Sequence, residues 1–366
     1  MTGTETEPGG ASRYLDTEGL YAALAETLGE PGFWALSPHE PGLGNETLFL
    51  VWGDRRFVVR RPPLAGAPAD AHDVFREFRL LEALEWTDLP TPHPVLAVED
   101  ERVARAPFTV VERLDGKVLR HGEPMAYVEG EHRRRFGEGL VDLLADVHAV
   151  DVAETGLADA GTGGDTAASP ALDRGLETRI REWRERFGAY REQTDRAVPG
   201  AGTVGEWLAA NVPDDRGRTL VHGDYTLDNL KFTPETPPEL VGVLDWERGG
   251  LGDPLADLGR LLAFWFETEA EACGLPWEFA PRFTTREGYH SRSGLVERYE
   301  AATGRTFTHD RFYRALAMFE AATVFEGYYL RNLTDASDRA GFGDLETAVP
   351  ALVERAGRVI DGEEPL

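Results

Sequence analysis

The chain has 366 residues, and its 65 Asp and Glu residues outnumber its 38 Lys and Arg residues to give a formal net charge of −27. A chain of this length forms about two domains and can bury a sizeable core. The hydrophobic fraction of 42% excludes an acidic disordered chain. The negative charge argues against nucleic acid or an anionic membrane as a partner, because both bind basic surfaces. The single cysteine, Cys273, excludes an intramolecular disulfide.

Lysine is nearly absent from this acidic chain. Lys117 and Lys231 are the two lysines, so 36 of the 38 basic residues are arginines. Dispersed carboxylates with arginine in place of lysine resemble the composition of haloarchaeal proteins, since a salt-rich cytoplasm screens the repulsion between like charges. The composition therefore predicts a halophilic protein and says nothing about its substrate.

The sequence shows neither a signal peptide nor a membrane-spanning pattern. Residues 1–10 are polar and acidic and lack the basic start and apolar stretch of a signal peptide. The longest apolar stretches, such as 261–266, are far shorter than the roughly 20 residues that span a bilayer. We expect a cytoplasmic protein without a membrane partner, and a disordered tail at residues 1–12.

Residues 13–114 have the pattern of a small β-rich lobe. Helical spacing occurs at 16–28 and again at 73–84, where Glu77 flanks the apolar face. Alternating or β-branched stretches predict five strands, at 33–36, 48–52, 57–60, 95–98 and 108–112. Gly53-Asp54 is the expected hairpin turn between two of them.

From residue 115 onward helical spacing dominates. The clearest periodicity lies in 136–150, and further helices are expected at 172–190, 203–211, 254–267, 286–302, 310–332 and 343–360. Residues 156–170 are rich in Gly, Ala, Thr and Asp, which predicts a surface loop or insertion. The chain is therefore expected to be α+β, with a β-rich lobe at 13–114 and a larger helical lobe at 115–366.

Three polar residues form the strongest functional pattern. Asp224 and Asn229 lie five residues apart in Leu-Val-His-Gly-Asp-Tyr-Thr-Leu-Asp-Asn, and Asp245 follows an apolar run sixteen residues later. Phosphoryl transfer from ATP needs a carboxylate that orients and deprotonates the attacking hydroxyl, and hard oxygen ligands for Mg²⁺. A loop between an Asp and an Asn, followed by an Asp at the end of a buried strand, supplies both.

Simpler roles exist for each of these residues and their neighbours. An Asp and an Asn at this spacing are often turn residues that satisfy their own backbone, but the joint spacing favours chemistry. His222 is expected to hold the loop structurally, and Cys273 to be inert. Asp253 stands directly before a proline, and we expect it and Asp257 to cap the following helix and brace the loop.

In their surroundings these residues resemble the aminoglycoside phosphotransferase family. The matching motifs are His-Gly-Asp-x₄-Asn at 222–229, Leu-Asp-Trp-Glu at 244–247 and Gly-Asp-Pro-Leu-Ala-Asp-Leu at 252–258, with support from 57–63, 71–78, 107–113 and 144–151. The similarity covers residues 33–335 and points to the branch related to the kinase-like domain of acyl-CoA dehydrogenase family members 10 and 11. The resemblance implies a bilobal, protein-kinase-like α+β fold with a small antiparallel sheet, and ATP and Mg²⁺ as cofactors.

The resemblance also implies roles for individual residues. Asp224 would be the catalytic base, and Asn229 and Asp245 the Mg²⁺ ligands. A loop over the phosphates would include Gly42, Gly44 and Asn45, where glycine lets backbone amides approach phosphate closely. A weak Gly-x-Gly pattern alone more often marks an ordinary turn. A hinge that binds adenine through its backbone would comprise Glu112, Arg113 and Leu114.

One position departs from the kinase pattern. Kinases carry a lysine on the third strand that holds phosphates and pairs with a helix glutamate, whereas the matching position here is Arg60, with Glu77 as its expected partner. Arginine keeps the charge but has a larger, planar head. An exposed Arg60 on an edge strand and a solvated Glu77 are the alternatives.

The short spacing after Asp245 favours a small-molecule acceptor. Only the seven residues 246–252 precede the Gly-Asp-Pro helix start, which leaves no room for a protein kinase's activation segment. We expect a small-molecule hydroxyl substrate in a pocket formed partly by the aromatic helix at 310–332, although most of its rings suit a core equally well. The relatives suggest a hydroxyacyl thioester as the acceptor, and an aminoglycoside or an amino alcohol is the alternative acceptor. A pseudokinase-like binding module without turnover is the rival function from another class. ATP or GTP preference and oligomeric state stay undetermined.

Overall fold

The computed structural model describes residues 16–39, 45–62, 74–119, 122–127, 129–155, 157, 175–214, 217–276, 279–334 and 345–366. The expected tail at 1–12, Gly42 and Gly44 lie outside the described residues, as does the expected loop at 156–170 apart from Leu157. The chain forms two compact units. Unit 1 is Met1–Asp115 together with Asp245–Glu247, and unit 2 is Gly116–Leu244 with Arg248–Leu366. The three residues that join unit 1 from far along the chain include Asp245, which the sequence pattern placed in the helical lobe.

Unit 1 is built on a five-stranded antiparallel sheet in the order β1-β2-β3-β5-β4. The strands are β1 (Trp34–Pro38), β2 (Glu46–Trp52), β3 (Arg55–Arg61), β4 (Pro94–Val98) and β5 (Phe108–Glu112). Gly53 adopts a φ of 63° in the turn between β2 and β3, as the hairpin pattern predicts. The described part of this unit also contains the helices α1 (Thr17–Leu28), α2 (Val74–Leu84) and the short α3 (Glu101–Ala104).

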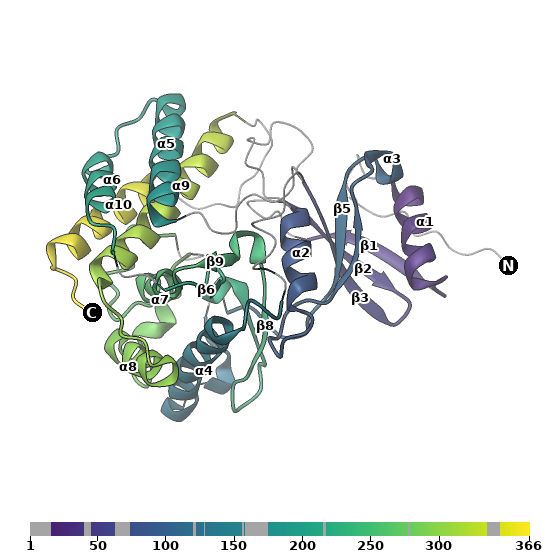
Figure 1. Cartoon of the computed structure of the whole chain (residues 1–366), viewed down its shortest axis with the longest axis horizontal. Helices are drawn as coiled ribbons and strands as arrows, with labels where there is room; N and C mark the ends of the chain where they lie inside the picture. Colours follow the sequence, from purple (N-terminus) through teal and green to yellow (C-terminus); the bar gives the residue numbers. More distant parts are fainter. Residues whose placement is uncertain are drawn as a thin grey trace. The chain divides into compact units, whose positions relative to one another are not determined.

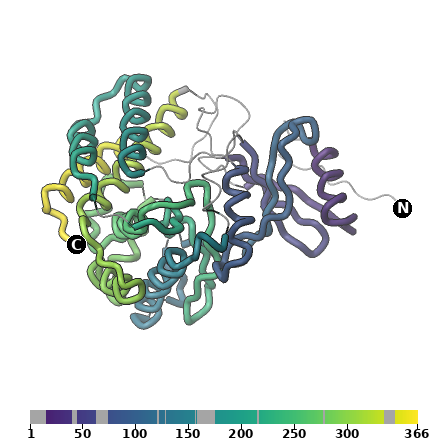
Figure 2. Tube along the Cα trace, viewed as in Figure 1, coloured from purple at the N-terminus to yellow at the C-terminus, as the bar shows by residue number. Residues whose placement is uncertain are grey.

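The two faces of the sheet meet different helices. Strand alternation places Phe57 and Val59 of β3 in a core that includes Leu20 and Leu24 of α1. Arg60 lies on the other face of β3, the side where α2 packs against β4 and β5. Figure 1 shows α1 and α2 on opposite sides of the sheet, and Figure 2 shows the purple and blue trace that forms it. The alternation therefore aims Arg60 at α2.

Unit 2 is mainly helical. Its helices are α4 (Gly130–Ala149), α5 (Leu176–Thr194), α6 (Ala201–Ala210), α7 (Pro254–Ala263), α8 (Arg292–Thr303), α9 (Asp310–Thr334) and α10 (Leu345–Asp361). Two small antiparallel ladders, β6 (Thr219–Val221) with β9 (Gly250–Gly252) and β7 (Leu230–Phe232) with β8 (Leu240–Val243), flank the Asp224 region. The long helix α9 packs against α10, α7 and α5. Together with the sheet of unit 1, these helices confirm the α+β fold class.

Helix α7 begins where its sequence predicts and ends earlier. The Asp253 carboxylate accepts a hydrogen bond from the backbone N–H of Leu255 at 3.1 Å, and Pro254 occupies the first turn. The sequence pattern extends this helix to residue 267, but it stops at Ala263, and the following Trp265 and Phe266 are buried. None of the described helices has the length and apolar character needed to cross a bilayer.

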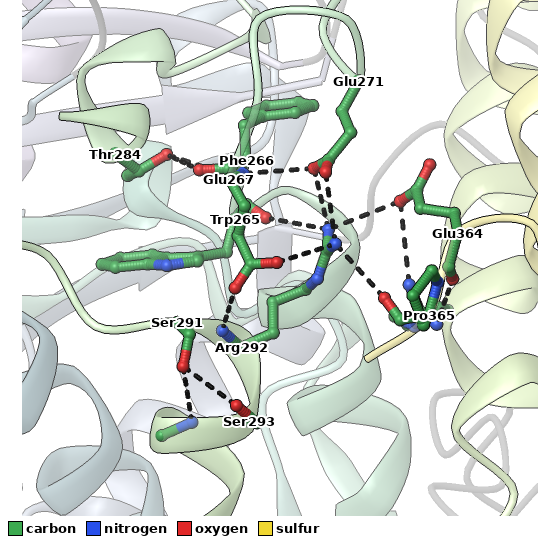
Figure 3. A network of polar contacts seen from close by, with 12 residues as sticks. Trp265, Phe266, Glu267, Glu271, Thr284, Ser291, Arg292, Ser293, Glu364 and Pro365 are labelled. Carbon is green, nitrogen blue, oxygen red and sulfur yellow. Dashed lines mark hydrogen bonds and ion pairs between the residues drawn. The ribbon is translucent and has the colours of Figure 1, made fainter. Parts of the chain in front are cut away.

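Buried arginines hold the last described residues of unit 2. Arg355 Nη2 lies 2.7 Å from Glu364 Oε1, and Arg314 Nη2 donates to the Glu364 carbonyl at 2.9 Å. Arg292 Nη1 lies 3.4 Å from Glu364 Oε1 and 2.8 Å from Glu271 Oε2, so this arginine bridges the two carboxylates (Figure 3). Burial lowers the pKa of Arg314 from its usual value. The nearby Cys273 is a free, exposed thiol.

Candidate active-site residues

In unit 1, one guanidinium is shared by three carboxylates. Arg60 Nη1 lies 2.5 Å from Glu77 Oε2, and both terminal nitrogens lie 3.1 Å from Asp245 Oδ1. Glu247 Oε2 is 3.6 Å from Arg60 Nη2. We call Arg60, Glu77, Asp245 and Glu247 the Arg60 cluster. Its side chains come from β3, from α2 and from the segment that follows Leu244 in the chain.

The Arg60 cluster is partly buried, and its charges interact strongly with one another. The Arg60 side chain is 17% exposed and that of Glu77 is 8% exposed. Burial disfavours the charged guanidinium, but the three carboxylates outweigh it and raise the pKa of Arg60. Burial raises the pKa of Glu77 to about 7. The negative charges of Asp245 and Glu247 also raise this pKa, whereas the positive charge of Arg60 lowers it. The cluster thus holds more negative than positive charge.

The backbone around Asp245 is held in an uncommon conformation. Asp245 has a φ of 63°, in the left-handed region that non-glycine residues seldom occupy. Glu77 accepts a hydrogen bond from the next backbone N–H, that of Trp246, at 3.2 Å. Arg76 donates to the carbonyl oxygen of Glu247. Helix α2 therefore forms two hydrogen bonds with this segment, and the Asp245 side chain contacts Arg60.

The other residues of unit 1 that are expected to bind nucleotide, Asn45 and residues 112–114, lie outside the Arg60 cluster. Asn45 is 4% exposed, and neither polar atom of its amide has a hydrogen-bond partner among the described residues. The backbone N–H groups of Glu112 and Arg113 donate to the carbonyls of His93 and Arg56, at 2.8 and 2.9 Å. The backbone N–H groups of both residues are therefore already occupied by hydrogen bonds within unit 1.

In unit 2, Asp224 and Asn229 share one tight loop. The Asn229 side-chain nitrogen donates to the Asp224 carbonyl at 2.9 Å, and the Leu244 N–H donates to the Asn229 carbonyl at 2.8 Å. We call residues 222–229 the Asp224 loop. The first of these hydrogen bonds involves the side-chain nitrogen of Asn229 and not its side-chain oxygen. An amide oxygen is a hard ligand of the kind that Mg²⁺ prefers.

Asp257 of α7 braces the start of this loop. Its carboxylate accepts hydrogen bonds from the backbone N–H groups of His222 and Gly223, at 2.6 and 2.8 Å. His148 Nε2 lies 3.3 Å from the same carboxylate, and its Nδ1 lies 2.8 Å from the Tyr299 hydroxyl. Burial opposes ionisation of Asp257, but these donors hold its pKa below the usual value. These contacts agree with the bracing role expected of Asp257.

His222 and Gly223 shape the loop from within. His222 is fully buried, its Nδ1 accepts from the Asp224 N–H at 3.2 Å, and its Nε2 donates to the Leu244 carbonyl at 2.8 Å. Gly223 has a φ of 79°, and a Cβ at this position would lie 2.6 Å from the Arg248 carbonyl oxygen. Both residues serve the loop's conformation, as expected for His222.

Arg260 binds the carboxylate of Asp224, a contact that the sequence patterns did not predict. Its Nε donates to Asp224 Oδ1 from the face of α7 that also carries Asp257. Burial disfavours the charged form of Asp224, but the nearby Arg260 and Arg248 lower its pKa to about 2. The signal was present in the sequence, since Arg260 is a lone charge in the apolar run 258–266 and a buried arginine needs a partner.

The aromatic residues of α9 mostly fill the core. Phe312, Tyr313 and Phe319 are at most 2% exposed. Towards the end of the helix Tyr328 and Tyr329 are half-buried, and Arg196 stacks on the Tyr329 ring with its guanidinium carbon 4.2 Å from the centroid. The first part of α9 therefore belongs to the core of unit 2, and the exposure of its rings increases towards its end.

The described residues offer oxygen donors to a metal ion, but not a complete set of protein ligands. Within the described part of the chain, no group of three or more His, Cys, Asp or Glu side chains is arranged to hold a metal. Asn229 in unit 2 and Asp245 in unit 1 offer oxygen atoms, and the excess negative charge of the Arg60 cluster favours an added cation. Each unit therefore offers, by itself, oxygen donors of the kind that Mg²⁺ prefers.

Comparison with known proteins identifies relatives over most of the chain. The model of the family described as "Phosphotransferase enzyme family" matches residues 35–295. Acyl-CoA dehydrogenase family member 10 of Mus musculus is 27% identical over 92% of this chain, and member 11 of Rattus norvegicus is 29% identical over 87%. The chain spans only 30% and 40% of the length of these two relatives.

Solved structures share the fold. A Ralstonia eutropha JMP134 protein assigned as an aminoglycoside phosphotransferase is 26% identical with a TM-score of 0.73, covering 95% of this chain and 98% of its own. Aminoglycoside phosphotransferase APH(4)-Ia, in a ternary complex with AMP-PNP and hygromycin B, is 16% identical with a TM-score of 0.58 and coverage of 95% and 99%. The second likeness concerns the fold alone. Together they confirm the protein-kinase-like fold that the sequence motifs implied.

Proposed function

The chain belongs to the phosphotransferase enzyme family, and from this premise we propose that it is an ATP- and Mg²⁺-dependent kinase of a small hydroxylated metabolite. The observation that carries the proposal is the Arg60 cluster. A strand cation paired with a helix glutamate and adjoining an aspartate is the set that kinases use to hold phosphates and metal. Here Arg60, Glu77 and Asp245 supply those three groups within contact distance.

The proposed roles follow from the contacts. When bound, Mg²⁺·ATP supplies the γ-phosphoryl group and neutralises charge on the phosphate oxygens. Asn229 and Asp245 would hold the magnesium ion, while Arg60 and the segment containing Gly42, Gly44 and Asn45 would bind phosphate. Backbone groups of the hinge at 112–114 would contact adenine. We assign nucleotide binding to the β-rich residues 13–114 and the acceptor pocket to residues 115–366.

Asp224 is proposed to act on the acceptor. With a pKa of about 2 it is ionised at neutral pH, so it can always accept a hydrogen bond from a hydroxyl. As the acceptor oxygen forms its bond to the γ-phosphorus, the bond from that phosphorus to the ADP oxygen breaks, and the hydroxyl proton passes to Asp224. Orientation is the larger part of this role, because phosphoryl transfer demands little covalent assistance.

For the acceptor we propose a hydroxyacyl thioester or a related compound. The support is the 27–29% identity to acyl-CoA dehydrogenase family members 10 and 11 over most of this chain. An aminoglycoside or amino alcohol is the alternative, favoured by the names of the structural neighbours. A non-catalytic binding module is the rival, since Arg60 stands where kinases carry lysine.

One assay separates these possibilities. ADP release is measured in high KCl with Mg²⁺·ATP and a panel of hydroxyacyl-CoAs, amino alcohols and aminoglycosides, with Asp224→Asn as the inactive control. We expect release with one acceptor class and a loss on the order of 10³-fold in the variant. Nucleotide-dependent stabilisation without turnover supports the binding module. Wild-type turnover in Asp224→Asn would refute the assignment of the base.

We also propose that the protein is adapted to high salt. A net charge of −27 destabilises the folded chain through self-repulsion, which dissolved KCl screens. The melting temperature should therefore rise steadily as KCl is added to dilute buffer. Full stability in dilute buffer would contradict this part of the proposal.

A further inference from the structure

The two oxygens of the Asp224 carboxylate have different surroundings. Oδ1 accepts the hydrogen bond from Arg260 Nε, while Oδ2 accepts none from the part of the chain that the structure describes. The side chain is 23% exposed. One oxygen is therefore held by the protein, and the other is left for a ligand.

Arg260 itself has little freedom to move. Its side chain is 9% exposed, and its guanidinium carbon lies 5.7 Å from the centre of the Phe264 ring. Its Nη1 lies 3.7 Å from Glu320 Oε2, and this buried nitrogen has no hydrogen-bond partner among the described residues. The guanidinium thus lies between two carboxylates, Asp224 on one side and Glu320 on the other.

Glu320 is fixed in turn by Arg179. The Glu320 side chain is fully buried on α9, and Arg179 of α5 binds both of its oxygens, at 2.5 and 2.8 Å. A two-pronged pair of this kind sets the plane of the carboxylate as well as its position. Arg179, Glu320, Arg260 and Asp224 form a line of alternating charges, which we call the Arg260 chain.

The backbone that carries Arg260 is also held closely. A Cβ on the preceding Gly259 would lie 2.4 Å from Tyr313 Cβ, so α7 and α9 approach to a distance that only glycine permits. The Tyr313 hydroxyl donates to the Asp253 carboxylate at 2.6 Å at the start of α7. Three residues before Arg260, Asp257 binds the loop's backbone. One helix therefore fixes both the main chain and the catalytic side chain of the Asp224 loop.

We propose that Arg260 is a positioning residue for phosphoryl transfer, which holds Asp224 Oδ1 so that Oδ2 receives the acceptor's hydroxyl, and that Glu320 and Arg179 hold Arg260 in this orientation. The inference rests on the proposed kinase function. Stability alone does not explain the arrangement, because buried ion pairs are often no more stabilising than well-packed apolar residues. Orientation does explain it, since a shift of about 1 Å in a reacting group costs about 100-fold in rate.

The test compares kcat and KM in four variants, using the acceptor that gives the highest wild-type turnover. Arg260→Ala should lower kcat about 10- to 100-fold and leave the KM for Mg²⁺·ATP within about twofold, because the Arg60 cluster is untouched. Arg260→Lys should recover part of the loss. Glu320→Gln and Arg179→Met should each lower kcat by up to about tenfold, since they loosen Arg260 without removing it.

Two controls separate positioning from a structural role. Guanidinium ion, added well below denaturing concentrations, should restore turnover in Arg260→Ala, whereas tetramethylammonium should not. Arg298→Ala removes a partly exposed arginine that binds Asp142 with its Nε at 2.7 Å, and it should keep the wild-type kcat. A merely structural Arg260 would lower the melting temperature and give no chemical rescue.

The outcomes distinguish this inference from the proposed function. If wild-type protein gives no Asp224-dependent turnover, the kinase proposal fails and the positioning role fails with it. Wild-type turnover together with an unchanged kcat in Arg260→Ala would overturn the positioning role alone. If Arg260→Ala does not fold, Glu320→Gln and Arg179→Met decide, and wild-type kcat in both would overturn it.

Discussion

The Arg60 cluster and the Arg260 chain are both partly buried groups of arginines and carboxylates, but their charges are arranged differently. In the cluster three carboxylates share Arg60, and the pKa of Glu77 rises to about 7. In the chain acids and bases alternate, and the pKa of Asp224 falls to about 2. An excess of negative charge favours an added cation, whereas a balanced line needs none. The first group is suited to a metal-bound nucleotide, and the second to fixing a geometry.

The largest effect is expected from the unbalanced cluster. Asp245→Asn removes a proposed metal ligand, so turnover should fall on the order of 10³-fold and the Mg²⁺ concentration needed for the residual rate should rise. The measurement is a magnesium titration of ADP release. Asp115→Asn changes a carboxylate of unit 1 that is 78% exposed and should behave as wild type. Equal magnesium dependence in the variant and the wild type would remove Asp245 from the metal site.

A smaller effect, on stability, is expected from the brace of the Asp224 loop. Asp257→Asn removes a buried charge that accepts hydrogen bonds from two backbone N–H groups and lies beside His148. Breaking such an arrangement should lower the free energy of unfolding by about 3 kcal/mol. Urea unfolding in KCl measures it, with the exposed Asp146→Asn as a control expected to change stability by less than about 0.5 kcal/mol. An unchanged urea midpoint in Asp257→Asn would contradict the bracing role.

Acid should weaken the same brace. The folded-state pKa of Asp257 lies below the unfolded value of about 3.9. Its stabilisation is therefore complete above that value and is lost as the pH falls through the folded pKa. Urea midpoints measured from pH 7 down to pH 3 should fall less in Asp257→Asn than in wild type. Parallel curves for the two proteins would show that Asp257 contributes nothing to the acid sensitivity.

The smallest effect is expected from an exposed ion pair. Arg298 and Asp142 are 36% and 48% exposed, and their nearest oxygen and nitrogen atoms lie 2.5 Å apart. Arg298→Ala should cost about 0.2–1 kcal/mol in dilute buffer, and less in concentrated KCl because salt screens exposed charges. Glu320→Gln should keep its effect on kcat in the same salt. If KCl reduced the effect of Glu320→Gln on kcat as much as it reduces the effect of Arg298→Ala on stability, the Arg260 chain would be no better shielded from salt than a surface ion pair.

The parts of the molecule that the sequence predicted well depend on local patterns. Strand β5 matches its predicted span of 108–112 because four apolar or β-branched residues, followed by Glu112, lie between turn signals. The Gly53-Asp54 hairpin and the Asp253 cap follow from backbone preferences within a few residues. The alternation in β3 also explains why Arg60, and not Arg61, meets Glu77, since Arg61 lies on the core face and binds Glu46.

The parts that local patterns could not predict depend on partners that are distant in the chain. Arg260 meets Asp224 across 36 residues, and Arg179 meets Glu320 across 141. His148 lies within the matching motif at 144–151, but nothing nearby in the sequence indicates that it binds Asp257. A lone charge in an apolar helix predicts that a partner exists, and only the folded chain identifies it.

The exposed Cys273 makes the protein convenient for spectroscopy. Because it is the chain's one thiol, a single label can be attached to unit 2 without removing any native cysteine. Trp86 in unit 1 is 89% exposed and offers a place for a second, introduced cysteine. Paired spin labels at these positions would report the distance distribution between the units before and after nucleotide is added.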